Sequence, residues 1–566
     1  MDQSARFGGR TPDVLLAWGV GILGAFVWWS FAWISDDSYF TFRTIEVWFA
    51  GYGPNFNSGQ RVWGTSSPLW FLLLSAGRLL HRDLYWVALA LSAICTGLTF
   101  YFGWRMLRDS FGWVIFVLLL LGSRVLLDYS SSGLETPLMY ALLTAFMWRY
   151  LELFDSEPTP RDLWTLACIS SLVLVTRHDL SILIGPLLLW VFLSFRSTLS
   201  IGRWAVLAAA AAAPLLLWTA FSAFYYGSLV PPAIRAKLGF AKYGDTTEVL
   251  LQGIDNLAVI AYDPISILVL VVGFAVCVRR ARLGAPLAVG SLLYLGVYTY
   301  HGGDWMDARI FTPVLIALLP LATRALVSLA RPIVWVAAGV GAVLCLTWPD
   351  YPWETAAEYI TDHREIMKGW NEYFREGSHG APTVTHWCPD WAHLPAMPAD
   401  PATTWVPWFP VRIPTGFKPP FLAQQYACGR FFRGSNVSIG GVYVIPLGLF
   451  SYFAGADKFI VERFLFDPLL TRLPPSYLGK YLHRTQHWFR PGHVHHDLPI
   501  GYIESLIRGE NRIEDPAIAR LYDDVVLATQ GPLLASGRFA AIWRLNTGHD
   551  YGTDAPWNAV WGAATY

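Results

Sequence analysis

Long apolar runs dominate the first 350 residues of this 566-residue chain and constrain its fold more than any other feature. Eleven runs approach the length, roughly 17 to 25 residues, at which a helix crosses the ~30 Å hydrocarbon core of a bilayer. Only 14% of all residues are charged, against about 25% in ordinary soluble domains, which excludes an ordinary soluble enzyme. The sequence therefore predicts a polytopic α-helical membrane protein. The predicted spans lie near 14–34, 84–104, 111–127, 134–150, 162–176, 180–195, 204–224, 264–278, 284–300, 310–327 and 333–349.

Arginine groups between the runs predict the orientation of the bundle, because basic residues near span ends mark the cytoplasmic side. The polar N-terminal segment with Arg6 and Arg10 lacks a small-residue cleavage pattern, so we expect the first run to remain as a span. Taking every group as cytoplasmic places the N-terminus in the cytoplasm, and an odd number of spans places the C-terminus outside the plasma (inner) membrane. The later groups are Arg105 and Arg108; Arg149 and Arg161; Arg196 and Arg203; Arg279, Arg280 and Arg282; and Arg324 and Arg331.

The apolar run from Pro68 to Leu80 is about thirteen residues long, which is short for a crossing. We expect it to lie along the outer face of the membrane or to dip into it. A true span at this point would turn most of the later arginine groups outward, against the charge bias. An extra short helix within the bundle is the alternative.

Residues 351–566 contain no run of spanning length. Short strand-like runs such as 441–450 are broken by proline, glycine and aromatic clusters, a pattern typical of a turn-rich aqueous domain. We therefore expect a transmembrane domain over 1–350 and an extracytoplasmic domain over 351–566 that is β-rich or mixed α/β. Its many tryptophans favour carbohydrate binding, because flat aromatic faces suit sugar rings, although burial is the commoner fate of tryptophan. Trp387 and Trp391, together with Trp63 of the first half, are the acceptor-binding candidates.

The same tail holds a candidate disulfide and a candidate metal motif. Cys388 and Cys428 are the two cysteines outside the apolar runs, and an oxidising exterior would allow them to pair. The His-Val-His-His-Asp motif at 493–497 has the ligand types of a metal site. Its spacing matches no common site, so a polar loop is the favoured reading, and a divalent metal cofactor stays open.

Acidic residues gather in the segments expected on the outer side of the bundle, where acids near the membrane are costly and usually functional. Asp36 and Asp37 follow the first span. Neighbours on a helix point about 100° apart, so one carboxylate can face a cavity while the other orients or caps. The pair predicts one base that accepts a proton from an attacking hydroxyl, or a metal ligand. Two solvated acids at the end of a span are the alternative.

Three further sequences add acids on the same predicted side. Glu135 stands in Ser-Ser-Gly-Leu-Glu-Thr-Pro at 131–137, Asp179 follows Arg177 and His178, and Asp304 ends a Gly-Gly-Asp turn. Each has a structural alternative: a glutamate favoured by the helix dipole, a polar pair at a helix start, and a flexible corner beside an interfacial tryptophan. Their common side predicts a single reaction face, with Glu135, His178, Asp179 and Asp304 as catalytic candidates.

Phosphate recognition needs cations on that face. Arg61, Arg235 and Lys237 are the donor-phosphate candidates, because arginine offers a planar fork for phosphate oxygens and lysine a compact charge. The alternative for the last two is a snorkelling pair on the amphipathic segment 233–243.

The acidic pair after the first run, the Glu135 motif and the multispan body with an aqueous tail resemble the GT-C glycosyltransferases, which use polyprenyl-phosphate sugars. More narrowly, NFNSGQRVWGTSSPLW at 55–70 and HGGDWM at 301–306 resemble the terminal arabinofuranosyltransferases of mycobacteria and their relatives. The resemblance implies transfer of D-arabinofuranose from decaprenyl-phosphoryl-arabinofuranose to arabinan ends of arabinogalactan and lipoarabinomannan in cell-wall assembly. Membrane lipid is an expected partner, and the balance of 41 basic and 41 acidic residues gives no reason to expect nucleic acid.

The resemblance also shapes the expected mechanism. Phosphate departs readily once its charge is screened, so electrostatic stabilisation should matter more than proton donation. Donor and product are both β-linked, which calls for a carboxylate nucleophile or for front-side attack. Three alternatives differ in class: a GT-C enzyme for another polyprenyl-phosphate sugar, a polyprenyl-lipid flippase or transporter, and a catalytically silent carbohydrate-binding membrane protein. Transporters commonly show internal repeats and broken helices, neither of which the sequence displays.

Overall fold

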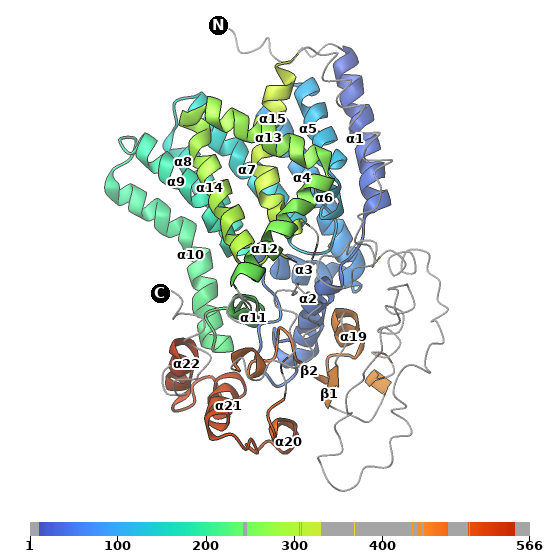
Figure 1. The fold of residues 1–566 in the computed structure, drawn as a ribbon, viewed down its shortest axis with the longest axis vertical. Coiled ribbons are helices and arrows are strands. Elements are labelled where there is room, and N and C mark those ends of the chain that lie inside the picture. Colours follow the sequence, from blue (N-terminus) through green and yellow to red (C-terminus); the bar gives the residue numbers. More distant parts are fainter. Residues whose placement is uncertain are drawn as a thin grey trace. The chain divides into compact units, whose positions relative to one another are not determined.

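The computed structural model describes residues 11–240, 246–304, 306, 308–329, 367, 430, 432–434, 439–442, 447–473, 496 and 498–548 (Figure 1). These form two compact units. The first unit comprises the described residues of Met1–Ile34, Ser67–Leu216 and Gly253–Glu354. The second comprises those of Ser35–Ser66, Leu217–Gln252 and Thr355–Tyr566. Two segments of the first half of the sequence therefore group with the tail.

The first unit is helical because its sequence consists of apolar runs separated by capping residues. Ten of the eleven predicted runs fall in the described residues and are helical, although the run at 111–127 is divided between α5 and α6; the run at 333–349 lies outside the described residues. The central helix is α15, which contacts α4, α5, α7, α13 and α14. The helices of this unit are α1 (Thr11–Phe31), α3 (Pro68–Leu80), α4 (Leu84–Leu107), α5 (Ser110–Gly122), α6 (Arg124–Asp128), α7 (Thr136–Asp155), α8 (Pro160–Thr176), η3 (His178–Leu180), α9 (Ser181–Phe195), most of α10 (Ile201–Tyr226), the end of α12 (Thr246–Ala258), η4 (Val259–Tyr262), α13 (Pro264–Arg279), α14 (Ala281–Tyr300), η5 (Arg309–Phe311) and α15 (Thr312–Val327).

Several of these helices are long and apolar enough to cross a bilayer, so the chain is a multi-pass membrane protein. Among the described residues there are five such helices, or up to seven if each of two bent helix pairs counts as one span. The prediction of eleven spans is larger because some runs form shorter helices, such as α5 with 13 residues and α8 with 17. The five are Leu84–Leu107, His178–Phe195, Ile201–Tyr226, Ala281–Tyr300 and Arg309–Val327. The bent pairs, Leu15–Phe31 with Asp36–Tyr52 (83°) and Thr246–Tyr262 with Pro264–Arg279 (103°), are breaks between apolar helices that the sequence did not reveal.

The short run at 68–80 forms the 13-residue helix α3, which begins at Pro68. Proline suits a first helical turn because its missing N–H would have no partner there. A helix of 13 residues is about 20 Å long, shorter than the hydrocarbon core. Its place at the outer face of the membrane stays a prediction.

In its described residues the second unit combines helices with one two-stranded sheet. Strands β1 and β2 pair in parallel, with Ile439 opposite Phe459 and Val442 opposite Glu462. In the described part of the tail helices outnumber strands, so a mixed α/β tail fits this part better than a β-rich one. Its elements are α2 (Asp36–Val47), η2 (Trp48–Tyr52), α11 (Pro232–Phe240), β1 (Ile439–Val442), α19 (Leu447–Phe453), β2 (Phe459–Glu462), η8 (Leu470–Arg472), α20 (Tyr502–Arg508), α21 (Pro516–Thr529) and α22 (Arg538–Thr547).

The core of the second unit joins residues from opposite ends of the chain. Phe40, Phe56 and Val62 are buried in one apolar cluster with Phe450 and Phe466. Beside this cluster Arg43 is also buried, and its guanidinium donates to the carbonyl oxygens of Phe56 (2.9 Å), Gly455 (2.9 Å) and Lys458 (2.6 Å) and to that of Ser451. A buried guanidinium is stable when its N–H groups have such acceptors. Arg43 therefore fixes the segment after Asp36 and Asp37 against the tail.

The strand-like run at 441–450 is not one strand. Its start lies in β1, whereas residues 447–450 open helix α19. The prediction of a strand was wrong for this second part, because the helix receives its N-terminal cap from Asp36, which lies 412 residues away from Gly448. A local sequence pattern cannot reveal such a partner.

Candidate functional site

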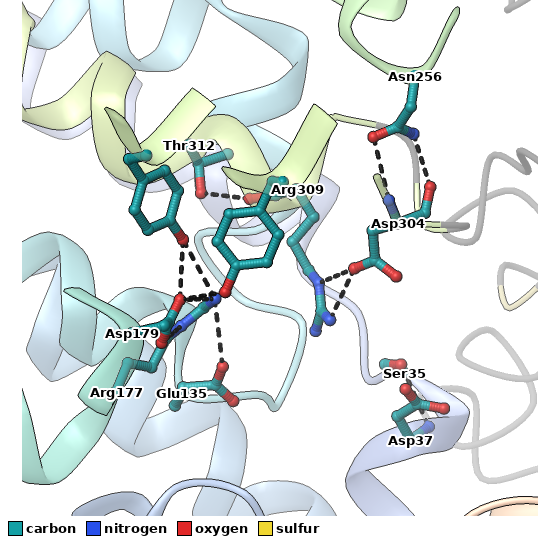
Figure 2. A network of polar contacts seen from close by, with 11 residues as sticks. Ser35, Asp37, Glu135, Arg177, Asp179, Asn256, Asp304, Arg309 and Thr312 are labelled. Carbon is teal, nitrogen blue, oxygen red and sulfur yellow. Dashed lines mark hydrogen bonds and ion pairs between the residues drawn. The ribbon is translucent and has the colours of Figure 1, made fainter. Parts of the chain in front are cut away.

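The acidic pair Asp36-Asp37 opens helix α2 in the second unit. The side chain of Ser35 caps this helix by accepting a hydrogen bond from the backbone N–H of Asp37 at 3.3 Å (Figure 2). Acidic side chains in a first turn are favoured by the helix dipole. The sequence therefore sets both carboxylates at a helix N-terminus, which confines them to a small region.

The two carboxylates differ sharply in their surroundings. Asp36 is only 2% exposed, and its Oδ2 and Oδ1 accept hydrogen bonds from the backbone N–H groups of Gly448 (3.0 Å) and Leu449 (2.8 Å). The approach is so close that a Cβ on Gly448 would lie 2.1 Å from the carbonyl oxygen of Asp36. Asp36 thus caps α19, whereas Asp37 is half-buried. The structure thus gives Asp36 a capping role, and the reactive role of Asp37 stays a prediction.

A second cluster of charges lies in the first unit, where η3 places Asp179 beside Arg177 (Figure 2). The Arg177 guanidinium binds the Asp179 carboxylate through both Nε (3.1 Å) and Nη2 (2.7 Å). The hydroxyls of Tyr294 and Tyr298 donate to Asp179 Oδ2 at 3.0 and 2.5 Å. Asp179 is therefore held as a carboxylate by one cation and two phenols. His178 opens η3, is half-buried, and interacts electrostatically with Asp179.

Glu135 is the loosely held acid of this cluster. It precedes α7 and its side chain makes no cap hydrogen bond to that helix. Arg177 lies near it, with 3.7 Å between Arg177 Nη1 and Glu135 Oε1, and Arg309 also attracts it electrostatically. The side chain is 11% exposed. Glu135 lies in the field of two arginines, and within the described residues no hydrogen bond fixes its carboxylate.

Asp304, the third acidic candidate in the first unit, is fixed from both sides (Figure 2). Its Oδ2 accepts from Nη2 (2.9 Å) and Nε (3.3 Å) of Arg309. The side chain of Asn256 binds both the backbone oxygen (2.6 Å) and the backbone N–H (3.1 Å) of Asp304. Gly303 has a φ of 75°, and a Cβ there would lie 2.4 Å from Asn256 Oδ1. The Gly-Gly-Asp turn is thus a packed corner that requires glycine, rather than a flexible one.

The three acids of the charge cluster in the first unit differ in how they are paired with Arg177 and Arg309. Asp179 and Asp304 each have an arginine of their own, and Glu135 shares both arginines without a close partner. A substrate with a hydroxyl or an anionic group could replace the weak Glu135 contact at little cost. Among the described residues no group of three histidine, cysteine or acidic side chains has the geometry to hold a metal ion.

Arg61, a predicted phosphate ligand, contacts backbone carbonyl oxygens of the protein. Its guanidinium donates to the carbonyl oxygens of Tyr225 (3.2 Å), Ala528 (3.2 Å) and Gly531 (2.5 Å). Its backbone N–H donates to the carbonyl oxygen of Thr529 at 2.9 Å. The last carbonyls of a helix have no intrahelical partner, and a cation stabilises them. The Arg61 side chain therefore caps the C-terminus of helix α21, and its role in phosphate binding stays a prediction.

The other two cations lie on α11. Arg235 is buried, with 7% of its surface exposed, and its Nη2 donates to the Ser228 hydroxyl at 2.9 Å. Helix α11 contacts η8, which carries the buried Arg472. Burial and the positive charge of Arg472 both lower the pKa of Arg235. Lys237 lies on the same helix, and its side chain is not among the described parts of the chain.

Trp63 is buried, with 4% of its surface exposed. Its ring stacks on Tyr226 with 5.9 Å between centroids and meets Trp218 edge-on at 5.6 Å. The acceptor-binding candidates Trp387 and Trp391 and the disulfide candidates Cys388 and Cys428 lie outside the described residues. So does the 493–497 motif except for His496, which is buried and has Nδ1 3.0 Å from the Arg463 carbonyl oxygen.

Four residues around these candidates were not predicted. Tyr294 and Tyr298 are four residues apart in an apolar helix, a spacing that places both phenols on one face and could have revealed them. Arg309 follows Asp304 by five residues, and its membrane-level charge was the available signal. Arg472 gave no sequence signal, because its partner helix α11 is far away in the chain.

Comparison with known proteins gives two curated relatives, each described as a terminal beta-(1->2)-arabinofuranosyltransferase. The protein from Mycobacterium tuberculosis is 28% identical over 241 residues, which cover 40% of this chain and 36% of the relative. That from Corynebacterium glutamicum is 25% identical over 411 residues, covering 62% of this chain and 57% of the relative. The matched part of the chain thus spans about a third of the length of the first relative and somewhat over half of the length of the second. No family model matches the chain. No solved structure matches it.

Proposed function

We propose that the protein is a GT-C-type glycosyltransferase that transfers D-arabinofuranose from decaprenyl-phosphoryl-arabinofuranose to the non-reducing ends of arabinan. The observation that carries the proposal is the similarity of this chain to two terminal arabinofuranosyltransferases. The multi-pass character of the chain and its acids at helix starts support the proposal. The proposal includes the expected orientation, with a cytoplasmic N-terminus and an extracytoplasmic tail that meets the arabinan of arabinogalactan and lipoarabinomannan.

Asp37 is the proposed base. Both oxygens of its neighbour Asp36 already accept backbone hydrogen bonds, whereas Asp37 is half-buried at the start of α2. In the proposed step Asp37 takes the proton of an acceptor hydroxyl, whose oxygen bonds to the anomeric carbon. The bond between that carbon and the phosphate oxygen breaks, and its electron pair leaves with the polyprenyl phosphate.

Arg235 is the proposed ligand of the donor phosphate. Arg235 and Arg472 are buried in neighbouring elements, where little water screens their positive charge from an anion. Guanidinium groups match phosphate oxygens in shape and charge. Screening of the phosphate by these cations favours its departure without a proton donor.

The charge cluster of the first unit is proposed to hold substrate groups through Glu135. Its carboxylate has the weakest contact of the three acids, so a sugar hydroxyl can compete for it. Asp179 and Asp304 then serve to keep Arg177 and Arg309 in place. Glu135 is the catalytic candidate of this unit that a substitution tests most cleanly.

The proposed product has the anomeric configuration of the donor, so the reaction requires retention. Retention proceeds either through a covalent sugar ester of a carboxylate or through front-side attack. Mass spectrometry of the protein after incubation with donor alone distinguishes them. A mass increase of one pentose would identify the ester route, and peptide mapping would locate the carboxylate.

The test is arabinose transfer in membranes that contain the protein, with donor and an arabinan acceptor supplied. We expect Asp37→Asn and Glu135→Gln each to lose transfer. Glu510→Gln, a change at an exposed acid paired with Arg512, is the matched control and should retain it. Undiminished transfer by both site variants would defeat the proposed roles. Lipid flipping without any transfer would instead favour the transporter alternative.

A further inference from the structure

Helix α22 has two unlike faces. Arg538, Ala541 and Leu545 are buried, with 0 to 1% of their surface exposed. Phe539 and Trp543, four residues apart on the opposite face, are 56% and 67% exposed. Two large aromatic side chains on one face of a short helix form an apolar surface that water solvates poorly.

Helix α22 is fixed rather than loosely attached, which gives this face a defined direction. Arg538 Nη2 donates to the Tyr225 carbonyl oxygen at 3.1 Å, at the end of helix α10. Asn546 Nδ2 donates to the Gly227 carbonyl oxygen at 3.0 Å, and its Oδ1 accepts from the Leu229 N–H at 2.9 Å. Both ends of α22 are thereby held against residues 225–229 (Figure 1).

The end of α10 presents an exposed apolar face at the same place. Leu217, Phe221 and Phe224 are 70%, 38% and 39% exposed and follow the spacing of one helix face. The ring of Phe224 lies 6.2 Å from that of Phe539 on α22. The two exposed faces are therefore continuous.

Because the exposed faces of α10 and α22 are continuous, the surroundings of α10 indicate those of α22. Helix α10 is one of the candidate membrane spans, and only 11% of its apolar window is buried within the protein, which is the exposure of a lipid-facing helix. It ends at Tyr226, after which Gly227 has a φ of 70°, a common helix terminus. The contact with Phe539 lies within one helical turn of this end, where a span meets the headgroups.

We propose that α22 is a membrane-contact helix that lies in the boundary between lipid headgroups and acyl chains, with Phe539 and Trp543 inserted into the lipid. Tryptophan is suited to this depth because its ring is apolar and its indole N–H can bind water or headgroups. The charged side of the helix fits the same position, since Arg544 is engaged by Asp524 (2.6 and 2.8 Å) away from the lipid face. This inference does not depend on the proposed transfer reaction.

The experiment measures the depth of a fluorophore on the full-length protein. A single cysteine is introduced as Trp543→Cys in a background whose native cysteines are replaced, and is labelled with the environment-sensitive dye NBD. The protein is reconstituted in vesicles of phosphatidylcholine and phosphatidylglycerol. Quenching is then compared for lipids with a nitroxide near the headgroup and for iodide in the water. Phe539→Cys is the second test position, and Arg520→Cys, at an exposed site on α21, is the matched control.

We expect the labels at 543 and 539 to be quenched severalfold more by the nitroxide lipid than the label at 520. We expect iodide to quench the label at 520 and to leave the other two largely unaffected. Strong iodide quenching at 543 and 539 would overturn the proposal, because the face would then lie in water. Protection from both quenchers would overturn it too, because protein would then cover the face.

Discussion

The division of roles between Asp36 and Asp37 leads to a prediction about stability as well as activity. The change Asp36→Ala removes the acceptor of the backbone N–H groups of Gly448 and Leu449, both of which are buried. A buried N–H left without its acceptor costs about 1–3 kcal/mol, and loss of an N-cap side chain costs about 0.5–2 kcal/mol. Since the two bonds share one carboxylate, we expect a loss of about 2–4 kcal/mol, a large part of an ordinary stability of about 5–15 kcal/mol.

Hydrogen exchange of the purified protein measures this loss where it occurs. Opening of α19 should become more frequent by a factor on the order of 30 to 1,000, since about 1.4 kcal/mol corresponds to tenfold. The amides of 447–453 should therefore exchange much faster in Asp36→Ala. Asp36→Asn keeps one acceptor oxygen and should lie between this variant and the natural protein.

The neighbouring change Asp37→Asn is the matched control. It should leave exchange at 447–453 near the natural rate and abolish transfer, because Asp37 is the proposed base. Natural exchange rates in Asp36→Ala would refute the capping role. Full transfer by Asp37→Asn would refute the assignment of the base, even if Asp36→Ala showed the expected loss of the cap.

Four further predictions concern other charged groups. Asp179→Ala removes the bidentate partner of buried Arg177, so we expect a loss of about 3–5 kcal/mol in thermal unfolding; an unchanged midpoint would contradict the pair's role. Glu135→Gln should change stability by less than about 1 kcal/mol while abolishing transfer, and a large stability loss would show a structural role instead. Arg61→Ala should speed hydrogen exchange at 528–531, whereas natural exchange with a raised KM for the donor would favour phosphate binding. Burial raises the pKa of Glu462 to about 7, so the folded chain keeps a proton that the unfolded chain releases; the contribution of Glu462 to stability should therefore fall as pH rises from about 4.5 to about 7. Glu462→Gln should remove this pH dependence in unfolding measured across that range, and a contribution that rises with pH would contradict the buried state.

The helices of the first unit were predictable because hydrophobicity acts locally. A run such as 204–224 needs no distant partner to become a helix in a membrane, and α10 covers it. The same holds for Pro68 at the start of a short helix. Ends and lengths were less predictable, since α5 stops at Gly122 whereas the apolar run continues to 127.

The second unit was harder to predict because its key contacts join distant segments. Nothing near Gly448 shows that Asp36 will cap its helix, and nothing near Arg61 shows that carbonyls of α21 will surround it. The sequence alone does not distinguish an arginine that caps the C-terminus of a helix from one that binds phosphate. The position of the acids before helices was visible, but the different burial of Asp36 and Asp37 depends on contacts formed by the tail.

The central claim is that this protein transfers a sugar from a polyprenyl phosphate. The most direct measurement offers purified, reconstituted protein a panel of radiolabelled decaprenyl-phosphate sugars with an arabinan acceptor, with and without a chelator. We predict incorporation of label from decaprenyl-phosphoryl-arabinofuranose above that from the other donors, and its loss in Asp37→Asn. Preference for another sugar would correct the donor, and absence of incorporation from every donor, by protein whose fold is intact, would contradict the account.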